Sequence, residues 1–193
     1  SLPPSKLEDI GVLSGVGLLG GAMLRDFAIV ATAYGVNLQD LKASGVVGIS
    51  ALFIGVILSF FVGALIAIIF GYTDPVSVTT IGAGTVTFVV GPVTGSALNA
   101  SSEIVALSIA AGLVKSILVM IGTPLFAKYV GLDNPKSAMI FGGLMGTNSG
   151  VAAGLAAVDP KLVPYGAMTA TFYTGVGCLI VPSLLYFIII AIL

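Results

Sequence analysis

Long stretches without a charged residue constrain the fold of this chain most. Residues 45–70 and 162–193 contain no Asp, Glu, Lys or Arg at all. Both stretches exceed the roughly 20 apolar residues that a helix needs to cross a bilayer. Only 8% of the 193 residues are charged, against about 25% in an ordinary soluble domain. The sequence therefore predicts an all-α integral membrane protein, with a surface that faces mostly hydrocarbon.

Four segments are predicted to cross the membrane completely. Residues 10–24 are uncharged but span only about 22 Å as a helix, so we expect this helix to continue through Arg25 and Asp26 to about Val36. The other predicted spans are residues 45–70, 104–127 and 162–193. Together they predict one transmembrane domain over residues 1–193, with N-terminal helices in 1–75 and a transport core in 76–193.

Two further uncharged segments, residues 77–99 and 137–158, are interrupted by glycine and by Pro92. They resemble each other weakly: the glycines at 91 and 95 recur 59 positions later, at 150 and 154. The helices that follow them carry Pro124 and Pro182 at nearly the same offset. This pattern indicates an internal repeat built around two broken helices.

The lysines indicate whether the broken segments cross the membrane or re-enter it. If both segments cross, three lysines lie on one side and two on the other, so neither orientation is favoured. If both are re-entrant hairpins, four lysines share one side: Lys42, Lys128, Lys136 and Lys161. Cytoplasmic loops are enriched in lysine and arginine. We therefore expect four spans plus two re-entrant hairpins, with both termini outside.

The hairpin tips, near residues 87–94 and 146–150, are expected to meet near the midplane of the membrane. Non-helical backbone at that depth must line a protein-enclosed or watery cavity. Helix N-termini there can bind an anion, and unwound carbonyls can coordinate Na⁺. The sharpest motif is GTNSG at 146–150, where three polar side chains lie between glycines. The alternative interpretation is that these small residues only let helices pack closely.

The candidate site residues follow from these tips and from the charges inside apolar runs. An unpaired charge at mid-bilayer costs roughly 2.5–3.5 kcal/mol, so such charges must pair or face a cavity. The predicted substrate-binding residues are Thr147, Asn148, Ser149, Thr87, Thr94, Arg25 and Lys115. The predicted cation-binding residues are Asn148, Asp26, Thr85 and Ser96. Two alternatives stay open: a structural ion pair of Asp26 with Arg25 or Lys115, and threonine hydroxyls that bond to their own helix.

Several function classes find no support in the sequence. There is no histidine, the single cysteine, Cys178, lies among apolar neighbours, and no paired carboxylates share an apolar segment, so we do not expect an enzyme or a bound metal cofactor. No glycine-rich loop ends in the GK[ST] of ATP-binding proteins, and no basic run suggests nucleic acid. A secondary transporter is favoured. A channel, or a non-transporting anchor or ion-path subunit of a larger complex, is the alternative.

Four long stretches in one order resemble the MadM subunit of the bacterial malonate transporter. They are GGAMLRDFAIVATA (20–33), TTIGAGTVTFVVGPVTGSAL (79–98), GLDNPKSAMIFGGLMGTNSGVAAGLAA (131–157) and LVPYGAMTATFYTGVGCL (162–179). The resemblance implies a multi-pass protein of the bacterial inner membrane that imports malonate by symport with Na⁺ or H⁺. It also implies kinship with carriers that move paired hairpins by an elevator mechanism.

The same resemblance implies a partner and a longer N-terminus. The partner would be a smaller membrane subunit, MadL, in a hetero-oligomer for which a dimer of heterodimers is one arrangement. Family members are expected to carry further helices before the segment that begins near Leu7, so the resemblance suggests that the chain is trimmed or has a shorter architecture.

Overall fold

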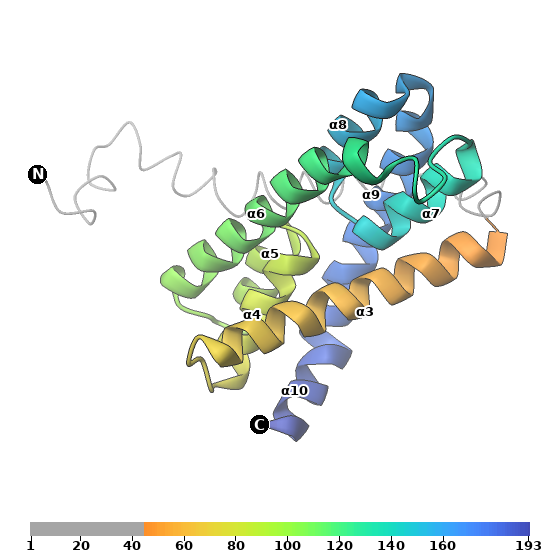
Figure 1. Cartoon of the computed structure of the whole chain (residues 1–193). Coiled ribbons are helices and arrows are strands. Elements are labelled where there is room, and N and C mark those ends of the chain that lie inside the picture. Colours follow the sequence, from red (N-terminus) through yellow and green to blue (C-terminus); the bar gives the residue numbers. More distant parts are fainter. Residues whose placement is uncertain (1–44) are drawn as a thin grey trace, which may run out of the picture. The chain divides into compact units, whose positions relative to one another are not determined.

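The computed structural model describes residues 45–193, and these residues form a bundle of α-helices without strands (Figure 1). The predicted span that contains Arg25 and Asp26 lies outside the described residues. The α-helices are α3 (Gly45–Ile69), α4 (Pro75–Val86), α5 (Val90–Ala97), α6 (Ser102–Phe126), α7 (Pro135–Met145), α8 (Asn148–Val158), α9 (Val163–Ile180) and α10 (Tyr186–Ile192). A 3-10 turn, η2 (Pro160–Leu162), precedes α9, and a π-helical turn, η3 (Val181–Leu185), joins α9 to α10.

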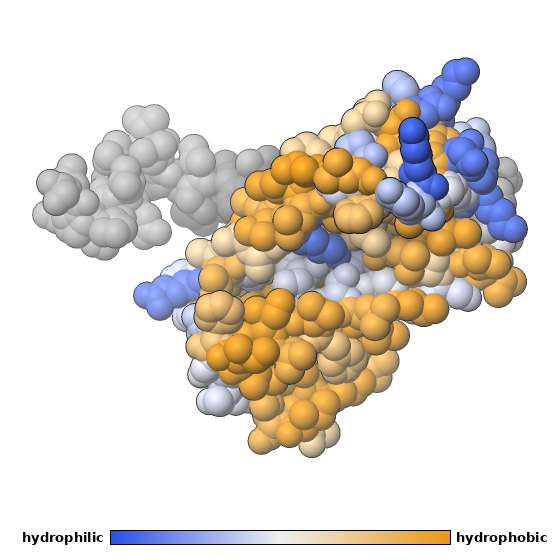
Figure 2. All heavy atoms as spheres, viewed as in Figure 1, coloured by the Kyte–Doolittle hydropathy of each residue, from blue (hydrophilic) through white to orange (hydrophobic). Residues whose placement is uncertain are grey.

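Three helical segments in the described part of the chain are long and apolar enough to cross a membrane. They are Gly45–Ile69, Ser102–Phe126 and the continuous run Pro160–Ile192. Large side chains on their outer faces stay exposed, such as Leu58 on α3 and Leu118 on α6. Apolar residues dominate much of the surface in Figure 2. These segments coincide with three of the four predicted spans.

The first broken segment folds back on itself as a helical hairpin of α4 and α5. A Cβ atom added at Gly91 would lie 3.0 Å from the Cα of Gly84, and one added at Gly95 would lie 3.0 Å from Cγ2 of Thr80. Position 84 therefore faces 91, and 80 faces 95, which is the pairing of two antiparallel helices. The turn between them lies at residues 87–89, where Thr87 is extended.

The second broken segment, α7 and α8, is a wider hairpin with α9 packed against both arms. A Cβ atom at Gly166 of α9 would meet Ala138 of α7 on one side and Val151 and Leu155 of α8 on the other. The direct contact between α7 and α8 is much smaller than the contact of either helix with α9. The turn lies at Gly146 and Thr147, where Gly146 has a left-handed φ of 70°.

The two hairpins begin in the same way, which strengthens the evidence for an internal repeat. Asp74 caps α4 by accepting a hydrogen bond from the amide of Ser77 at 2.8 Å, and Pro75 starts the helix. Asn134 caps α7 by accepting from the amide of Ser137 at 3.0 Å, and Pro135 starts that helix. Both caps satisfy amide groups that the first turn of a helix leaves free.

The helices packed against the hairpins also correspond. Gly84 of α4 meets Ser108 of α6, and 58 positions later Gly142 of α7 meets Gly166 of α9. The units α4–α5–α6 and α7–α8–α9 therefore share an order of elements and a corresponding close contact, as the predicted repeat would require. Because the long helix α6 joins the bases of the two hairpins, they approach each other from opposite ends of α6.

The cap at Asp74 predicts a loss of stability in acid. Partial burial raises the pKa of the Asp74 carboxyl, but hydrogen bonds from Ser77 and from the backbone amides of Asp74 and Val76 together lower it more, so the pKa lies below its usual value of 3.8. The stabilisation is present above that value and is lost as the pH falls through the lower folded pKa. Thermal unfolding in detergent between pH 6 and pH 3 is expected to show a smaller acid-induced drop in Asp74→Asn, which keeps an uncharged cap, than in the parent chain. An equal drop in both would contradict this role.

Candidate functional site

The two hairpin tips converge on the middle of α6. The tip of the first hairpin packs on Gly112, where an added Cβ would collide with the backbone of Phe88. The tip of the second hairpin contacts Ser116 one turn further along, through a short hydrogen bond between the hydroxyls of Ser116 and Thr147. Helix α3 packs against the first arm of each hairpin, α4 and α7. The two tips therefore contact α6 one helical turn apart, at Gly112 and at Ser116.

Lys115 projects into this meeting point. Its ammonium donates to Oγ of Ser59 at 2.9 Å, to the carbonyl of Val86 at 3.0 Å and to the hydroxyl of Tyr173 at 3.2 Å. The three acceptors come from α3, from the last turn of α4 before the first tip, and from α9. Among residues 45–193, all hydrogen-bond partners of this ammonium are uncharged. A cation held only by neutral dipoles in an apolar protein attracts an anion strongly.

Tyr173 joins the ammonium to the tip of the second hairpin. Its hydroxyl donates to the carbonyl of Gly55 at 3.1 Å, and its ring centroid lies 5.1 Å from Nζ of Lys115. The ring fills the space where Gly146 would carry a side chain. Tyr173 is fully buried. One aromatic ring thus touches both the cation and the glycine at which the second hairpin turns.

The helix that leaves each tip begins differently. Thr87 caps α5, since its hydroxyl accepts from the amides of Val89 and Val90 at 3.3 and 3.2 Å. At the start of α8, the side chain of Thr147 makes no capping hydrogen bond. The first amides of a helix point outward and favour a negative charge. The start of α8 therefore keeps donors for an anion that the start of α5 has already used.

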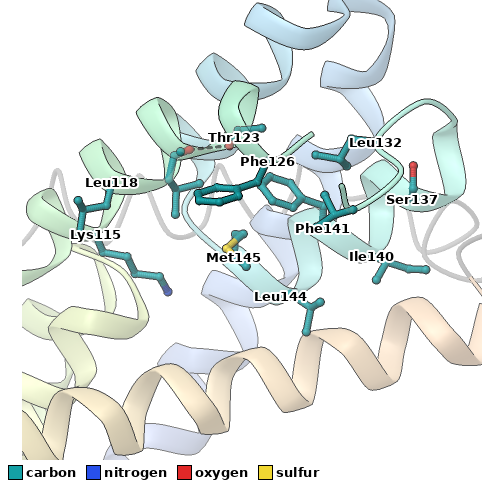
Figure 3. Close-up of a pocket in the computed structure, with 13 residues that line it drawn as sticks. Lys115, Leu118, Thr123, Phe126, Leu132, Ser137, Ile140, Phe141, Leu144 and Met145 are labelled. Carbon is teal, nitrogen blue, oxygen red and sulfur yellow. Dashed lines mark hydrogen bonds between the residues drawn. The ribbon is translucent and has the colours of Figure 1, made fainter. Parts of the chain in front are cut away.

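A cavity of about 620 Å³ opens beside Lys115, between α6 and α7. Its walls are mostly apolar, with Phe126, Phe141 and Met145 among them, and Figure 3 shows the amino group of Lys115 pointing into the space between α6 and α3. In Figure 2, hydrophilic atoms lie in a hollow between two apolar parts of the surface. The cavity volume falls in the range typical of small-molecule sites, about 300–1,000 Å³.

The structure brings some of the predicted substrate residues to this point and leaves others away from it. Lys115 bonds to Val86 beside the first tip, and Thr147 bonds to Ser116 at the second tip. Oδ1 of Asn148 accepts from the hydroxyl of Thr171 at 3.2 Å. Ser149 is exposed, Thr87 serves as the cap of α5, and Thr94 is buried without a hydrogen-bond partner. Arg25 lies outside the described residues.

The predicted cation residues other than Asn148 are dispersed. The hydroxyl of Thr85 donates to the carbonyls of Ser59 and Gly82, as the helix-bonding alternative for threonine expects. Ser96 is exposed on α5. Asp26 lies outside the described residues. An ion pair of Asp26 with Lys115 therefore stays a prediction.

Sequence reasoning missed Ser59, Ser116 and Tyr173. Each lies singly in an apolar helix, where serine and tyrosine also occur for packing reasons alone. One signal was present for Tyr173: it lies 58 positions after Lys115, which is the offset between the two copies of the repeat. Lys115 and Tyr173, which are bonded to each other, therefore occupy corresponding positions of the predicted repeat.

Comparison with known protein families identifies the family of this chain. The family model described as "Malonate/sodium symporter MadM subunit" matches residues 4–193. The chain belongs to the MadM family. As a MadM chain it is a subunit of a transporter, and the family description indicates malonate as substrate and sodium as coupling ion. Searches among curated proteins and among solved structures find no significant match.

Proposed function

We propose that this chain contains the substrate site of a symporter that imports malonate together with Na⁺. The observation that carries the proposal is the ammonium of Lys115, held between two hairpin tips by uncharged groups. One carboxylate of malonate binds this ammonium. The other binds the free amides at the start of α8, beside Asn148. The amides and the ammonium together offer a dianion one full and one partial positive charge.

The repeat supports an alternating-access mechanism of the elevator type. Hairpins that approach from opposite ends of α6 enter the membrane from opposite sides if α6 crosses it, and each tip then separates the site from one compartment. Inverted repeats with binding at the midplane are a common plan of secondary transporters. In this proposal, opening of one hairpin exposes malonate to one side while the other stays closed.

The setting of this site is the bacterial inner membrane, which the chain crosses several times. A small MadL-like subunit is proposed as partner, because the family description names MadM as a subunit. The apolar outer faces of α3 and α6 offer surface for lipid and for this partner. Coupling to Na⁺ rather than H⁺ follows the family description and is tested directly below.

The first test is uptake of radiolabelled malonate into proteoliposomes that hold the chain with its co-expressed partner. Accumulation driven by an imposed Na⁺ gradient is expected, and accumulation driven by a proton gradient alone would reassign the coupling ion. Saturation at low substrate separates a carrier from a channel, which would give passive flux that does not saturate. Absence of malonate uptake under every gradient, with folded protein, would overturn the proposed substrate.

Asn148→Ala is expected to weaken malonate uptake at least about tenfold, because a lost hydrogen bond to a charged group typically costs 1.5–3 kcal/mol. The matched control is Asp159→Ala. Asp159 lies in the turn after α8 and accepts only a local hydrogen bond from Lys161. Initial uptake rates over a range of malonate concentrations give KM for both variants. Equal rates in the two variants would remove Asn148 from the binding site.

A further inference from the structure

Three hydroxyl groups near the base of the first hairpin have no hydrogen-bond partner, although they are fully buried. They belong to Thr79 and Thr80 of α4 and to Thr94 of α5. Most buried threonines elsewhere in the described part of the chain are satisfied; Thr123, for example, donates to the carbonyl of Val119. A buried polar group without a partner is costly. Three such groups in one hairpin need an explanation that the substrate site does not supply.

Thr79 and Thr94 face the same neighbour, the end of α9. A Cβ added at Gly177 of α9 would lie 2.9 Å from Val86 and 3.0 Å from Val90, so these valines mark the faces of α4 and α5 that look toward α9. Thr79 precedes Val86 by two helical turns, and Thr94 follows Val90 by one turn, so each threonine lies on the same face as its valine. The pairing of Thr80 with Gly95 puts both threonines at nearly the same level of the hairpin.

The partner at that level is the π-helical turn η3. Both α4 and α5 contact η3, and α4 also contacts α10 beyond it. Pro182 lies in this turn and has no amide hydrogen, so it cannot donate to the carbonyl of Cys178 one turn earlier. Single π-helical turns inside longer helices often occur at functional sites. The two helices that carry these unpaired hydroxyls therefore pack against a turn in which π-helical hydrogen bonds, such as that from the amide of Tyr186 to the carbonyl of Val181, replace the α-helical ones.

From this arrangement, and resting on the proposed function, we infer that the coupling Na⁺ binds between the first hairpin and the π-helical turn. The ligands are the hydroxyl oxygens of Thr79 and Thr94 and a backbone carbonyl oxygen of the π-helical turn η3, which contacts both α4 and α5. Oxygen ligands without full charge suit a hard monovalent cation, and unwound carbonyls serve this purpose in other transporters. Thr80, on the same level, supplies the remaining buried hydroxyl.

The position of this site also fits its task. Thr79 lies seven residues, about 10 Å along α4, from Val86, whose carbonyl binds Lys115. The bound Na⁺ thus lies well away from the ammonium of Lys115, and this separation reduces the repulsion between the two positive charges. At the same time one short helix joins the cation site to the tip. Binding of Na⁺ fixes the base of the hairpin against α9 and orders the tip for the substrate.

The test measures Na⁺ binding without malonate. The full chain, purified with its co-expressed partner, is heated in NaCl or in choline chloride of equal ionic strength, and binding of radioactive sodium is measured in parallel. We expect Na⁺ to raise the unfolding temperature of the parent, and Thr79→Val and Thr94→Val to require at least about tenfold more Na⁺ for the same shift. Ser183→Ala is the matched control, because Ser183 lies in the same turn but is exposed and bonds only to the carbonyl of Leu179.

The valine variants keep the size of threonine and remove a hydroxyl that has no partner, so their stability in choline chloride is expected to equal that of the parent or exceed it. If Thr79 and Thr94 had only a structural role, the valine variants would instead be less stable than the parent in both salts. Unchanged Na⁺ affinity in both variants, or no Na⁺ binding by the parent, would overturn the inference. The Na⁺-binding experiment contains no malonate, so its result is independent of the substrate. If malonate uptake fails, the proposed substrate is overturned, and the Na⁺-binding experiment still tests the cation site.

Discussion

Lys115→Met is expected to reduce malonate uptake to the level of empty liposomes. Methionine keeps most of the length of the lysine side chain but removes the only charge that the described residues bring to the hairpin tips. It also leaves the carbonyl of Val86, at the first tip, without its donor. Loss of a charge-assisted hydrogen bond costs about 1.5–3 kcal/mol, and the uncompensated second charge of malonate in an apolar cavity adds to this loss.

Lys128→Met is the matched control, because Lys128 is exposed just after α6. Initial rates and KM for malonate are compared in the same proteoliposomes, after gel filtration has shown that both variants are monodisperse. Lys115→Arg is expected to retain the charge but to fit poorly, since the planar guanidinium cannot make the same three contacts. Near-normal uptake by Lys115→Met would exclude the ammonium from the substrate site.

Gly146→Ala is expected to give the second large effect, through the shape of the second tip. Its φ of 70° costs an alanine about 1–2 kcal/mol, and the added methyl group would occupy the space of the Tyr173 ring. Either the tip or the ring must move, and the ring also positions Lys115. We therefore expect a clear drop in thermal stability together with loss of uptake.

Gly131→Ala separates these two causes. Gly131 also has a positive φ, 65°, but an added Cβ there would find no atom within 4 Å. The Gly131→Ala variant therefore measures only the conformational cost of placing alanine at a positive φ. Thermal unfolding of both variants in detergent is the measurement, and Gly146→Ala is expected to unfold several degrees lower. Equal unfolding temperatures would show that the tip moves freely away from Tyr173, and that the contact does not fix the site.

The fold was predictable where the sequence contains strong local signals. Uncharged runs located the three long helices, because hydrocarbon excludes charge over the whole length of a span. Glycine and proline located the breaks at Thr87 and Gly146, because these residues interrupt helices. The lysine distribution predicted that each broken segment folds back on itself. The packing of both α7 and α8 against α9 depends on contacts between distant residues, and no local pattern specifies it.

The site was predictable only in part, for a similar reason. Thr147, Asn148 and Ser149 are consecutive, yet successive residues on a helix point about 100° apart. The structure accordingly directs Thr147 to Ser116, brings Asn148 to Thr171 and leaves Ser149 exposed. Tyr173 escaped prediction because a tyrosine in an apolar helix has no distinguishing neighbours. Its role depends on the ring that it places under Gly146.

Lys115 and Tyr173 are 58 positions apart and bond to each other, so the two halves of the core contribute different residues to one contact. A single repeat that paired with an inverted copy of itself would have placed the same residue on both sides of the axis. Two lysines at the 3.2 Å now separating Lys115 from the Tyr173 hydroxyl would repel each other, and two tyrosines would offer no charge to an anion. Because one chain contains both halves, the two positions can differ, and here they are a lysine and a tyrosine. A symmetric pair of identical repeats could not place one ammonium beside one phenol.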